Sequence, residues 1–545
     1  MSKMPETHSL QIQTDAFLPW HGSWPLHIPT SLNYPDVPIW WILEKNLESF
    51  ADRPAIRFMD HESLVEKQVL TYKSLASMVS SVAAGLQRLG IQKGDRIAFY
   101  LPNSPELVIS YFAIWRAGAV AVPCNPMFRQ RELTNQLKDA EVRYLIASAP
   151  GSDNASAVAK QLGIGLVVAS DKGELTFNEL LSDDPRNLRE VHIDPADDLA
   201  LILYTGGTTG VPKGAMLTHR NIVANTMQFA EWYAFEPGGE TCISVLPLFH
   251  SGGMSGAMNV PLYGGATILL MSRFSPISVA KTIEAYRATR FFGVPTMFIS
   301  LLNDETSRRC DYSSLKACRT NASPLPASVK AAFDELVGRE VLIEGYGLTE
   351  TSPLTHANPI NKAKAGSIGI PLADTDAKIV DLKTGIDLSP KEIGEIMIRG
   401  PQVMKGYWNR REATAAAIQK GWLHTGDVAY MDEEGYFFIV DRLKDIINTA
   451  GYKVWPREVE EVLYSHSAVK LAAVVGVADS YRGEIVKAFV VLRESMNGHP
   501  TEHDIVSFCK EKLAAYKVPR LVEFRKELPV SGAGKILRRE LRAED

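Results

Sequence analysis

A loop rich in glycine and threonine carries the strongest chemical signal in the sequence. Residues 204–221 read Tyr-Thr-Gly-Gly-Thr-Thr-Gly-Val-Pro-Lys-Gly-Ala-Met-Leu-Thr-His-Arg-Asn. Glycine allows backbone N–H groups to come close to a phosphate and to adopt positive φ angles. Thr205, Thr208 and Thr209 add hydroxyl donors, and Lys213 adds a compact positive charge. This loop therefore predicts a site for a phosphate-rich ligand.

An ordinary turn between a strand and a helix is the alternative interpretation of this loop. The apolar run Leu199–Leu203 just before it is typical of a buried strand. The density of glycine and threonine favours the phosphate site over a plain turn. The loop is not a Walker A motif, because Pro212 precedes Lys213 and Gly214 follows it where that motif needs Gly-Lys-Ser/Thr.

Four further motifs follow along the chain. Residues 344–350 read Glu-Gly-Tyr-Gly-Leu-Thr-Glu, after the apolar stretch Val341–Ile343. Residues 421–427 read Gly-Trp-Leu-His-Thr-Gly-Asp. Residues 441–453 read Asp-Arg-Leu-Lys-Asp-Ile-Ile-Asn-Thr-Ala-Gly-Tyr-Lys, and residues 529–538 read Pro-Val-Ser-Gly-Ala-Gly-Lys-Ile-Leu-Arg. Each is weak alone, because a Gly-Asp pair is usually a turn and a lysine near a C-terminus is usually solvated.

The elements that must position these motifs alternate between helical and strand patterns. Apolar residues at spacings of three and four predict a helix that ends at Gly90: Leu75, Val79, Val82, Leu86 and Leu89. Arg96–Leu101 then reads as a strand. Ser104 is a predicted N-cap with Pro105 at the first helical position, and that helix runs to Gly118. Such alternation is typical of a mainly parallel sheet covered by helices.

A short internal similarity indicates two related α/β lobes. The stretch Phe112–Val122 places a helix, Ala-Gly-Ala and a strand in succession, and Val260–Leu270 resembles it. Ligands are expected between the lobes, at the ends of the strands. After Gly366, short alternating runs predict a small antiparallel β subdomain: Ala377–Val380, Glu395–Arg399 and Tyr436–Val440.

Beyond Asp441 the chain has enough elements for a core of its own. Helices are expected near Arg457–Tyr464 and Glu502–Leu513, and strands near Leu471–Val477 and Lys487–Leu492.

Composition excludes several classes of protein. The 545 residues are 46% hydrophobic and 22% charged, with a net charge of −5, so no basic surface for nucleic acid is expected. Ser110 and Arg116 interrupt the apolar stretch Leu107–Val122, so no transmembrane segment is predicted. The beginning of the sequence lacks the apolar core of a secretory signal. Five cysteines without a C-x-x-C pair favour a reducing compartment, and the cytoplasm is the expected location.

In this order, the five motifs resemble those of the acyl-adenylate-forming superfamily, and most closely those of AMP-forming fatty acyl-CoA synthetases. The resemblance covers roughly residues 45–542. It implies a multidomain α/β fold: a large N-terminal domain, residues 1–443, with two α/β lobes and a small β-barrel-like subdomain. It also implies a small, mobile α+β C-terminal domain, residues 444–545.

The resemblance further implies a two-step reaction. A carboxylate first attacks the α-phosphate of ATP, and pyrophosphate leaves. The thiol of coenzyme A then attacks the acyl-AMP carbonyl, and AMP leaves. Because the first step brings two anions together, cations and N–H donors must surround the site. Mg²⁺ is implied beside ATP, held by Thr205 and Glu350.

Other roles carry over by position within the motifs. The implied catalytic residues are Lys535, Thr205, Glu350 and His250. The implied ATP- and AMP-binding residues are Thr205, Gly206, Gly207, Thr208, Thr209, Lys213, Asn321, Ala322, Ser323, Glu344, Gly345, Tyr346, Gly347, Thr349, Asp427, Ile439, Arg442 and Lys535. Asp427 matches the acceptor of the ribose hydroxyls, and Lys535 matches the lysine that bridges the carboxylate and the phosphates.

A hinge and a thiol channel are also implied. Lys444 occupies the hinge position, where the C-terminal domain would rotate between the half-reactions and withdraw Lys535. Gly451, Tyr452 and Lys453 would then line the coenzyme A channel.

The acyl group itself is expected near residue 250. The acyl-binding residues are His250, Gly252, Gly253, Met254 and Met258. Small residues here leave room for a tunnel, and methionines tolerate varied chains, which favours a medium- or long-chain fatty acid. The alternative is that these glycines only allow close packing of a strand and a helix.

Two departures and several alternatives stand beside this reading. Asn321 replaces a typical glycine in the adenine-side segment, and His250 stands where amino-acid-activating relatives carry Asp. An aryl-acid CoA ligase, an amino-acid-activating module, a luciferase-like oxygenase and a nucleotide-binding regulator remain open. A homodimer and transient contact with a membrane surface also remain open.

Overall fold

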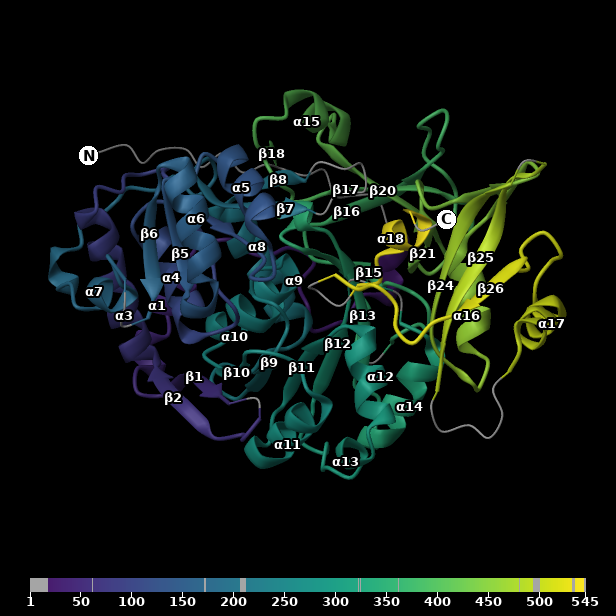
Figure 1. The fold of residues 1–545 in the computed structure, drawn as a ribbon, viewed down its shortest axis with the longest axis horizontal. Helices are drawn as coiled ribbons and strands as arrows, with labels where there is room; N and C mark the ends of the chain where they lie inside the picture. Colours follow the sequence, from purple (N-terminus) through teal and green to yellow (C-terminus); the bar gives the residue numbers. More distant parts are fainter. Residues whose placement is uncertain are drawn as a thin grey trace.

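The computed structural model describes residues 18–60, 62–170, 173–205, 212–321, 323, 325–360, 362–479, 481–493, 500–531 and 535–543. Two α/β lobes lie side by side, and the C-terminal elements gather at one end of the molecule, at the right in Figure 1. An antiparallel β subdomain lies between the lobes and that end. All element counts below refer to the described residues.

The first lobe contains a seven-stranded sheet in the order β18-β8-β7-β4-β3-β5-β6. Its strands are β3 (Arg96–Tyr100), β4 (Val120–Pro123), β5 (Tyr144–Ser148), β6 (Gly165–Ala169), β7 (Leu199–Thr205), β8 (Lys213–Thr218) and β18 (Gly406–Tyr407). The five strands from β7 to β6 run parallel, while β8 and β18 complete one edge in antiparallel pairs. The strand expected over Leu199–Leu203 is therefore confirmed as β7.

The second lobe contains a nine-stranded sheet in the order β15-β14-β13-β12-β11-β9-β10-β1-β2. Its strands are β1 (Pro54–Met59), β2 (Glu66–Thr71), β9 (Thr241–Ser244), β10 (Thr267–Met271), β11 (Arg290–Gly293), β12 (Ala317–Thr320), β13 (Leu342–Gly347), β14 (Leu354–Ala357) and β15 (Ile370–Pro371). The strands from β13 to β1 are parallel. β4 and β10, which end the two similar stretches of sequence, are parallel strands of the two sheets.

Helices cover these sheets in the pattern that the sequence predicts. They are α1 (Trp41–Glu44), α2 (Leu47–Phe50), α3 (Tyr72–Arg88), α4 (Pro105–Arg116), α5 (Gln130–Asp139), α6 (Ser152–Leu162), α7 (Phe177–Leu181), α8 (His219–Trp232), α9 (Ser251–Met254), α10 (Val260–Tyr263), α11 (Pro276–Tyr286), α12 (Pro295–Asn303), α13 (Glu305–Arg308) and α14 (Ala327–Val337). A π-helical turn, Ser255–Asn259, joins α9 to α10.

Local capping explains where α4 begins. The Ser104 hydroxyl accepts a hydrogen bond from the Leu107 N–H at 3.3 Å, and Pro105 starts the helix, as predicted. The helix ends at Arg116, two residues earlier than expected, and Gly118 takes a positive φ of 81° between helix and strand.

The N-terminal arm packs against distant parts of the large domain. Trp20 is buried against Phe437, with ring centroids 6.0 Å apart. Trp24 meets Trp232 edge to face at 5.2 Å. One hydrophobic core joins this arm to both α/β lobes and the β subdomain.

The predicted antiparallel β subdomain is confirmed. It consists of β16 (Asp376–Val380), β17 (Gly394–Arg399), β19 (Ile418–Gln419), β20 (Trp422–Met431) and β21 (Phe437–Arg442), with the helix α15 (Arg411–Ala417) beside it. β20 and β21 form a hairpin in which Asp427 faces Arg442. This hairpin ends where the C-terminal elements begin.

The C-terminal elements form a separate unit of structure with its own hydrophobic residues. They are β22 (Ile447–Thr449), β23 (Tyr452–Val454), α16 (Pro456–Tyr464), β24 (Val469–Asp479), β25 (Gly483–Leu492), α17 (Glu502–Lys512), β26 (Leu521–Phe524) and α18 (Arg538–Ala543). β24 and β25 are a long antiparallel pair, and β26 lies parallel to β25. Two buried clusters in this region are separate from the large core.

The fold class expected from the sequence is confirmed: a multidomain α/β protein with two parallel-sheet lobes, a small β subdomain and a small α+β C-terminal region. In the described part of the chain, every helix is too short or too polar to cross a membrane.

Candidate active site

A carboxylate shared between two sheets marks the first part of the site. Asp427, on β20, is buried and accepts a hydrogen bond from the Tyr346 hydroxyl at 2.6 Å. Tyr346 belongs to β13, so this bond joins the second lobe to the β subdomain. Because the hairpin places Arg442 opposite Asp427, the Arg442 Nε lies 3.2 Å from the carboxylate. Burial and the neighbouring Asp427 raise the pKa of Tyr346, so its hydroxyl keeps its proton.

A second carboxylate lies at the mouth of the phosphate loop. The Tyr407 hydroxyl donates to Glu350 Oε1 at 2.8 Å, and the Lys213 Nζ lies 5.1 Å from the centre of the Tyr407 ring. The antiparallel pair β7–β8 sets Thr205 opposite Lys213, and β18 brings Tyr407 to the same edge. A cation, a hydroxyl and a carboxylate therefore surround the ends of this loop.

Gly206, Gly207, Thr208 and Thr209, which form the body of the predicted phosphate loop, lie outside the described residues, as does Ala322.

His250 presents an uncharged donor to the site. Its Nδ1 accepts a hydrogen bond from the Gly252 N–H at 3.3 Å, which leaves the proton of the neutral ring on Nε2. Burial, with a further contribution from Lys535, lowers the pKa of His250 to about 4. At neutral pH this ring is an uncharged hydrogen-bond donor and binds no carboxylate as a cation.

Lys535 comes to this region from near the end of the chain. A short antiparallel bridge joins Val530 to Ile536, and the Lys535 N–H donates to the Ser531 hydroxyl at 3.2 Å. The Lys535 ammonium interacts electrostatically with His250, Asp427 and Arg442. Burial first, then Arg442, lower the pKa of Lys535 to about 7, while Asp427 raises it in part.

The adenine-side residues lie along β13 and after β12. Glu344 is buried and accepts a hydrogen bond from the Leu325 N–H at 3.4 Å, and burial raises its pKa to about 7. A Cβ at Gly347 would lie 1.8 Å from the Pro353 carbonyl oxygen, so only glycine fits there. Thr349 contacts the Ser251 hydroxyl, with 3.4 Å between the two oxygens.

Asn321 and Ser323 are half-buried in the segment that follows β12. The Ile439 carbonyl on β21 accepts a hydrogen bond from the Arg457 Nη1 at 2.7 Å.

The predicted acyl-binding residues follow His250 on one helix. Met254 and Met258 are fully buried. A Cβ at Gly253 would lie 2.1 Å from the Pro247 carbonyl oxygen, so packing alone requires this glycine. Gly252 has more room: its Cβ would lie 3.7 Å from both the Asn321 amide nitrogen and His250 Nδ1. Gly252 therefore lies between His250 and Asn321, and Asn321 is the residue that departs from the family's usual glycine.

The predicted thiol-channel residues stand apart from this cluster. Gly451, with φ of 85°, Tyr452 and Lys453 are exposed on the hairpin of β22 and β23. The Tyr452 ring stacks on Tyr516 at 4.7 Å, so among the described residues this hairpin contacts its own region.

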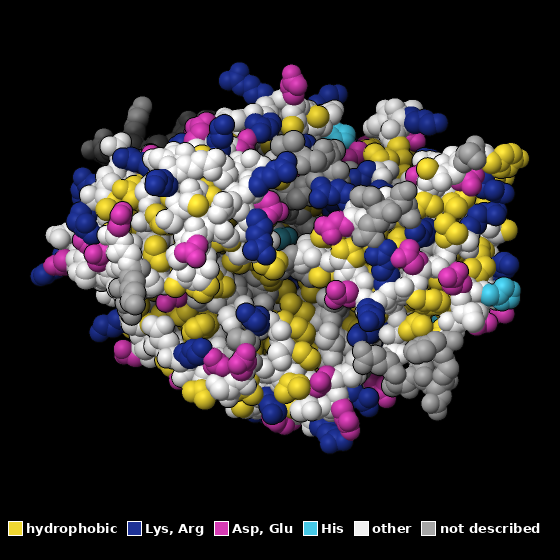
Figure 2. Space-filling model, in the orientation of Figure 1, with side chains coloured by type: hydrophobic (Ala, Val, Ile, Leu, Met, Phe, Trp, Pro, Cys, Tyr) yellow, Lys and Arg dark blue, Asp and Glu magenta, His cyan; other side chains and the backbone are white. Residues whose placement is uncertain are grey.

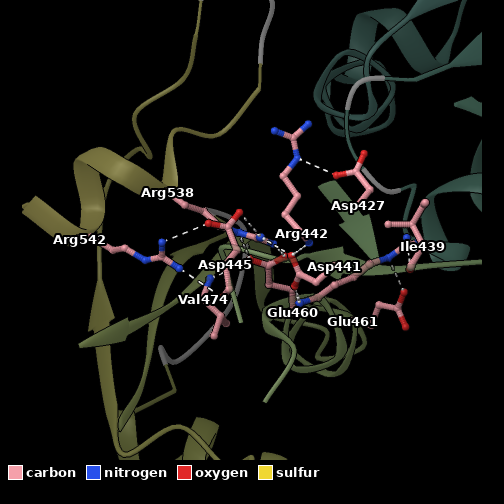
Figure 3. Close-up of polar contacts among 11 residues, drawn as sticks. Asp427, Ile439, Asp441, Arg442, Asp445, Glu460, Glu461, Val474, Arg538 and Arg542 are labelled. Atoms are coloured by element: carbon pink, nitrogen blue, oxygen red, sulfur yellow. Dashed lines mark hydrogen bonds and ion pairs between the residues drawn. The ribbon is translucent and has the colours of Figure 1, made fainter. Parts of the chain in front are cut away.

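The predicted hinge lies inside a dense network of charges. Lys444 follows β21 and is exposed, and the charges of Asp445 and Asp427 act on it. Figure 3 shows the polar contacts around Asp441, just before it. Asp441 accepts hydrogen bonds from the Arg457 N–H at 2.9 Å and from the Arg538 Nη1 at 3.1 Å. Both donors belong to the C-terminal region, and Asp441 belongs to the last strand before it. Any rotation about residue 444 must therefore break these bonds.

Comparison with known proteins places this geometry in a family. Residues 43–408 match the AMP-binding enzyme model, and residues 458–535 match the model of the AMP-binding enzyme C-terminal domain. The chain belongs to the AMP-binding enzyme family. The resemblance to the acyl-adenylate-forming superfamily is thereby confirmed, and the chain is an acid–thiol ligase.

Individual relatives match this AMP-binding enzyme over nearly its whole length. A long-chain-fatty-acid–CoA ligase of Bacillus subtilis (strain 168) is 42% identical over 559 residues, covering 97% of this chain and 98% of the relative. A protein of the same name from Escherichia coli O157:H7 is 38% identical over 563 residues, covering 96% and 98%. The crystal structure of the anthranilate CoA ligase AuaEII with anthranoyl-AMP superimposes with a TM-score of 0.86 at 29% identity, covering 94% of this chain and 97% of that one.

The residues of this AMP-binding enzyme fit a magnesium ion that arrives with its nucleotide. Mg²⁺ is typically held by one or two carboxylates together with substrate phosphates. Glu350 offers one hard oxygen site beside Thr205 and Lys213, and the described residues contain no cluster of three or more acidic, His or Cys ligands. This donor set suits an ion shared with ATP.

Sequence reasoning missed Tyr407 and Asp441. Tyr407 meets Glu350 across 57 residues of sequence, and nothing in the run Met404–Trp408 indicates that contact. Asp441 is the first residue of the motif at 441–453, but its two hydrogen bonds to the C-terminal region depend on tertiary structure.

Proposed function

We propose that this AMP-binding enzyme activates a carboxylic acid with ATP and transfers the acyl group to coenzyme A. The products of the first step are acyl-AMP and pyrophosphate, and those of the second are acyl-CoA and AMP. The position of Lys535 supports this proposal most strongly. A lysine from near the end of the chain lies within electrostatic reach of His250, Asp427 and Arg442. Attack of one anion on another needs a cation placed in this way.

In the first step, we assign the cations to the phosphates and the neutral groups to the acid. Lys535 and Lys213 would oppose charge that develops on the phosphates and the attacking carboxylate. The His250 Nε2–H would orient the carboxylate by a hydrogen bond without neutralising its charge. Glu350 and Thr205 would hold Mg²⁺, which neutralises phosphate charge when it is bound.

The nucleoside would lie between β13 and the β20–β21 hairpin. Asp427 has two oxygens that can accept further bonds from ribose hydroxyls, and Arg442 holds the carboxylate in place. The Tyr346 ring would stack against adenine, because its hydroxyl is already held by Asp427. The body of the phosphate loop, Gly206 to Thr209, keeps the role that the sequence predicts.

In the second step, the C-terminal domain would rotate about Lys444. We place the domain boundary between residues 443 and 444, where the large hydrophobic core ends and two separate clusters begin. Rotation would remove Lys535 from the pocket and bring the exposed hairpin of Gly451, Tyr452 and Lys453 toward the acyl carbonyl. The thiol of coenzyme A would then approach the acyl carbonyl from the side of the pocket that Lys535 has left.

A medium- or long-chain fatty acid is the substrate best supported by the relatives. The two relatives described above carry the name long-chain-fatty-acid–CoA ligase. An aryl acid is the second candidate, because the superimposed anthranilate CoA ligase binds anthranoyl-AMP.

A pyrophosphate-release screen tests the proposal. Fatty, aryl and amino acids are compared with ATP and Mg²⁺, each with and without coenzyme A, while AMP and acyl-CoA are quantified. Expected are pyrophosphate release with fatty or aryl acids and AMP release that depends on coenzyme A. Release with amino acids alone would favour the amino-acid-activating class, and release with no acid would reject the ligase reaction.

A further inference from the structure

An arginine without a hydrogen-bond partner among the described residues lies inside the second lobe. Arg319, on β12, has only 2% of its surface exposed. Its Nε, Nη1 and Nη2 donate no hydrogen bond to any described residue. A guanidinium carries five N–H donors and keeps its charge in proteins, so burial without an acceptor is unfavourable. The guanidinium of Arg319 therefore needs a hydrogen-bond acceptor that the described residues do not supply.

The surroundings of Arg319 add a second polar group and no negative charge. The guanidinium lies over the Phe229 ring at 4.1 Å and 5.4 Å from the Tyr233 ring, both on or next to α8. The buried Tyr233 hydroxyl also has no hydrogen-bond partner among the described residues. The neighbouring Arg290 is already paired with Glu240 at 2.6 Å. Arg319 is thus the cation of this region whose charge is not balanced by any described carboxylate.

This place is close to the centre where the acid reacts. Arg319 and Asn321 are two residues apart and point to the same face, which corresponds to about 7 Å along an extended chain. Asn321 lies beside Gly252 and His250, as shown by the 3.7 Å that a Cβ at Gly252 would leave to each. An acyl chain that passes from His250 along Gly252 and Asn321 would therefore run toward the guanidinium.

Glycines allow close packing around Arg319 and Phe229. A Cβ at Gly345 would lie 2.9 Å from the Arg319 Nε, so glycine makes space for the guanidinium. A Cβ at Gly256 would lie 3.1 Å from the Phe229 ring and 3.9 Å from the Phe292 ring. Gly252 and Gly256 lie on one face of the helix that follows His250, at a spacing of four residues.

Stacking alone does not account for Arg319. The Phe229 ring stabilises the face of the guanidinium through a cation–π contact. Its N–H groups lie in the guanidinium plane and need oxygen acceptors, which an aromatic ring does not provide. An apolar residue would fill the same space without that cost.

We propose that Arg319 and the Tyr233 hydroxyl bind a hydrogen-bond-accepting oxygen at the far end of the acyl group, above all a second carboxylate. The substrate class is then an acid with a polar group remote from the reacting carboxylate. A planar guanidinium binds a carboxylate through two parallel hydrogen bonds, which gives both affinity and orientation. This inference rests on the proposed ligase function and specifies its substrate.

Matched series of acids test the inference in the intact enzyme. Hexanoate, octanoate and decanoate are each compared with their ω-hydroxy and α,ω-dicarboxylic counterparts, and kcat/KM is measured from coupled acyl-CoA formation. At the length that reaches the guanidinium, the dicarboxylic acid is expected to exceed the unsubstituted acid by roughly 10- to 100-fold. A preference for the ω-hydroxy acid of that length would support binding of a neutral oxygen at the same place.

Variants then assign the preference to these two residues. Arg319→Met is expected to abolish the preference and to leave kcat/KM for the unsubstituted acid unchanged or higher. Tyr233→Phe, which removes only the hydroxyl, is expected to lower the preference about fivefold. Arg309→Met is the matched control, because Arg309, the residue after α13, is exposed and paired with Glu305; its preference should equal that of the wild type.

The outcomes separate this inference from the function it rests on. Wild-type enzyme that prefers the unsubstituted acid at every length overturns the inference while the ligase function stands. A preference that survives in Arg319→Met assigns recognition elsewhere and also overturns it. If Arg319→Met does not fold, the inference is decided by two other results. These are the wild-type ratio of kcat/KM for the dicarboxylic and the unsubstituted acid, and the change of that ratio in Tyr233→Phe. Absence of pyrophosphate release with every acid rejects the proposed function itself.

Discussion

Two arginines of this protein, Arg538 and Arg319, lie in opposite electrostatic surroundings. Arg538, on α18, contacts Glu460 at 2.6 Å, Asp441 at 3.1 Å and Asp445 at 3.6 Å. Arg319, on β12, has aromatic rings for neighbours and no described carboxylate. Burial lowers the pKa of Arg319, whereas at Arg538 the acidic neighbours outweigh burial and raise the pKa.

The difference separates a cation that holds structure from one that awaits a ligand. Asp441 on β21, Asp445 beside the proposed hinge and Glu460 on α16 converge on Arg538, so this residue ties the helix α18 to the end of β21 (Figure 3). Removing one member of such a buried group leaves the others unbalanced and is strongly destabilising. Removing a buried cation that no carboxylate balances is expected instead to leave the free energy of unfolding unchanged or to raise it.

Charged and hydrophobic side chains are also unevenly spread on the outside of the molecule. Figure 2 shows a hollow near the centre of this face, with Lys and Arg side chains along its upper edge and hydrophobic side chains below.

The largest effect is expected from the cation that the C-terminal region brings into the pocket. Lys535→Ala should lower the rate of acyl-AMP formation by ~10²–10³, because one partner of the transition-state charge is lost. Thioester formation from supplied acyl-AMP should remain nearly unchanged. Rapid-quench assays of the two half-reactions measure both rates, with the exposed Lys526→Ala as control. Equal losses in the two half-reactions would refute the division of labour.

The paired arginine should matter most for stability. Arg538→Met leaves Glu460 and Asp441 without their partner, so we expect a loss of about 3 kcal/mol or more in the free energy of unfolding of the C-terminal region. Urea unfolding followed by circular dichroism measures this, with the exposed Arg309→Met as control. A loss no larger than that of the control would show that Arg538 does not hold the helix.

The bonds across the proposed hinge should set the balance between the two half-reactions. Asp441→Asn weakens the bonds to Arg538 and the Arg457 N–H that hold the present arrangement. We expect acyl-AMP formation to fall roughly tenfold, as for the loss of a charge-assisted hydrogen bond, while thioester formation is unchanged or faster. Slower thioester formation would contradict a hinge at residue 444.

ATP binding should take up protons through Lys535. The pKa of Lys535 in the free enzyme is lowered to about 7, so the ammonium is lost as pH rises through that value. Phosphate charge raises the pKa, so binding recruits a proton and weakens as pH increases from 6 to 8. Calorimetry in buffers of different ionisation enthalpy should detect roughly half a proton at pH 7. Lys535→Ala should remove this uptake; an unchanged uptake would assign it to another group.

The smallest effect, and the sharpest contrast, is expected at the unpaired arginine. Arg319→Met should leave the free energy of unfolding unchanged or raise it by about 1 kcal/mol, because an unbalanced buried charge is replaced by an apolar side chain. Thermal unfolding of this variant beside Arg538→Met measures the contrast. A strong destabilisation by Arg319→Met would mean that the stacked guanidinium is itself structural.

Much of the local structure was predictable. Ser104 caps α4 because a hydroxyl before Pro105 can accept an N–H of the first turn, and this depends on neighbouring residues alone. The order of the five motifs predicted the family that the family models confirm. The helix α16 and the pair β24–β25 also follow the predicted patterns closely.

The arrangement of the site was harder to predict from the sequence. The sequence placed Arg319 in a segment that usually contains glycine, but β12 has only four residues, too few for periodicity to show that its side chain is buried. The contact of Tyr407 with Glu350 and the use of Gly253 for packing against Pro247 were equally hidden. These contacts join elements that the sequence leaves far apart.

The amino-acid pattern by itself determined the helices, the strands and the order of the reactive motifs, because spacing along the chain controls capping, periodicity and turns. Only the tertiary structure decided which buried charges find partners. Arg538 meets three carboxylates, and Arg319 meets none in the described part of the chain, since the balance of charge around a side chain depends on elements brought together by folding.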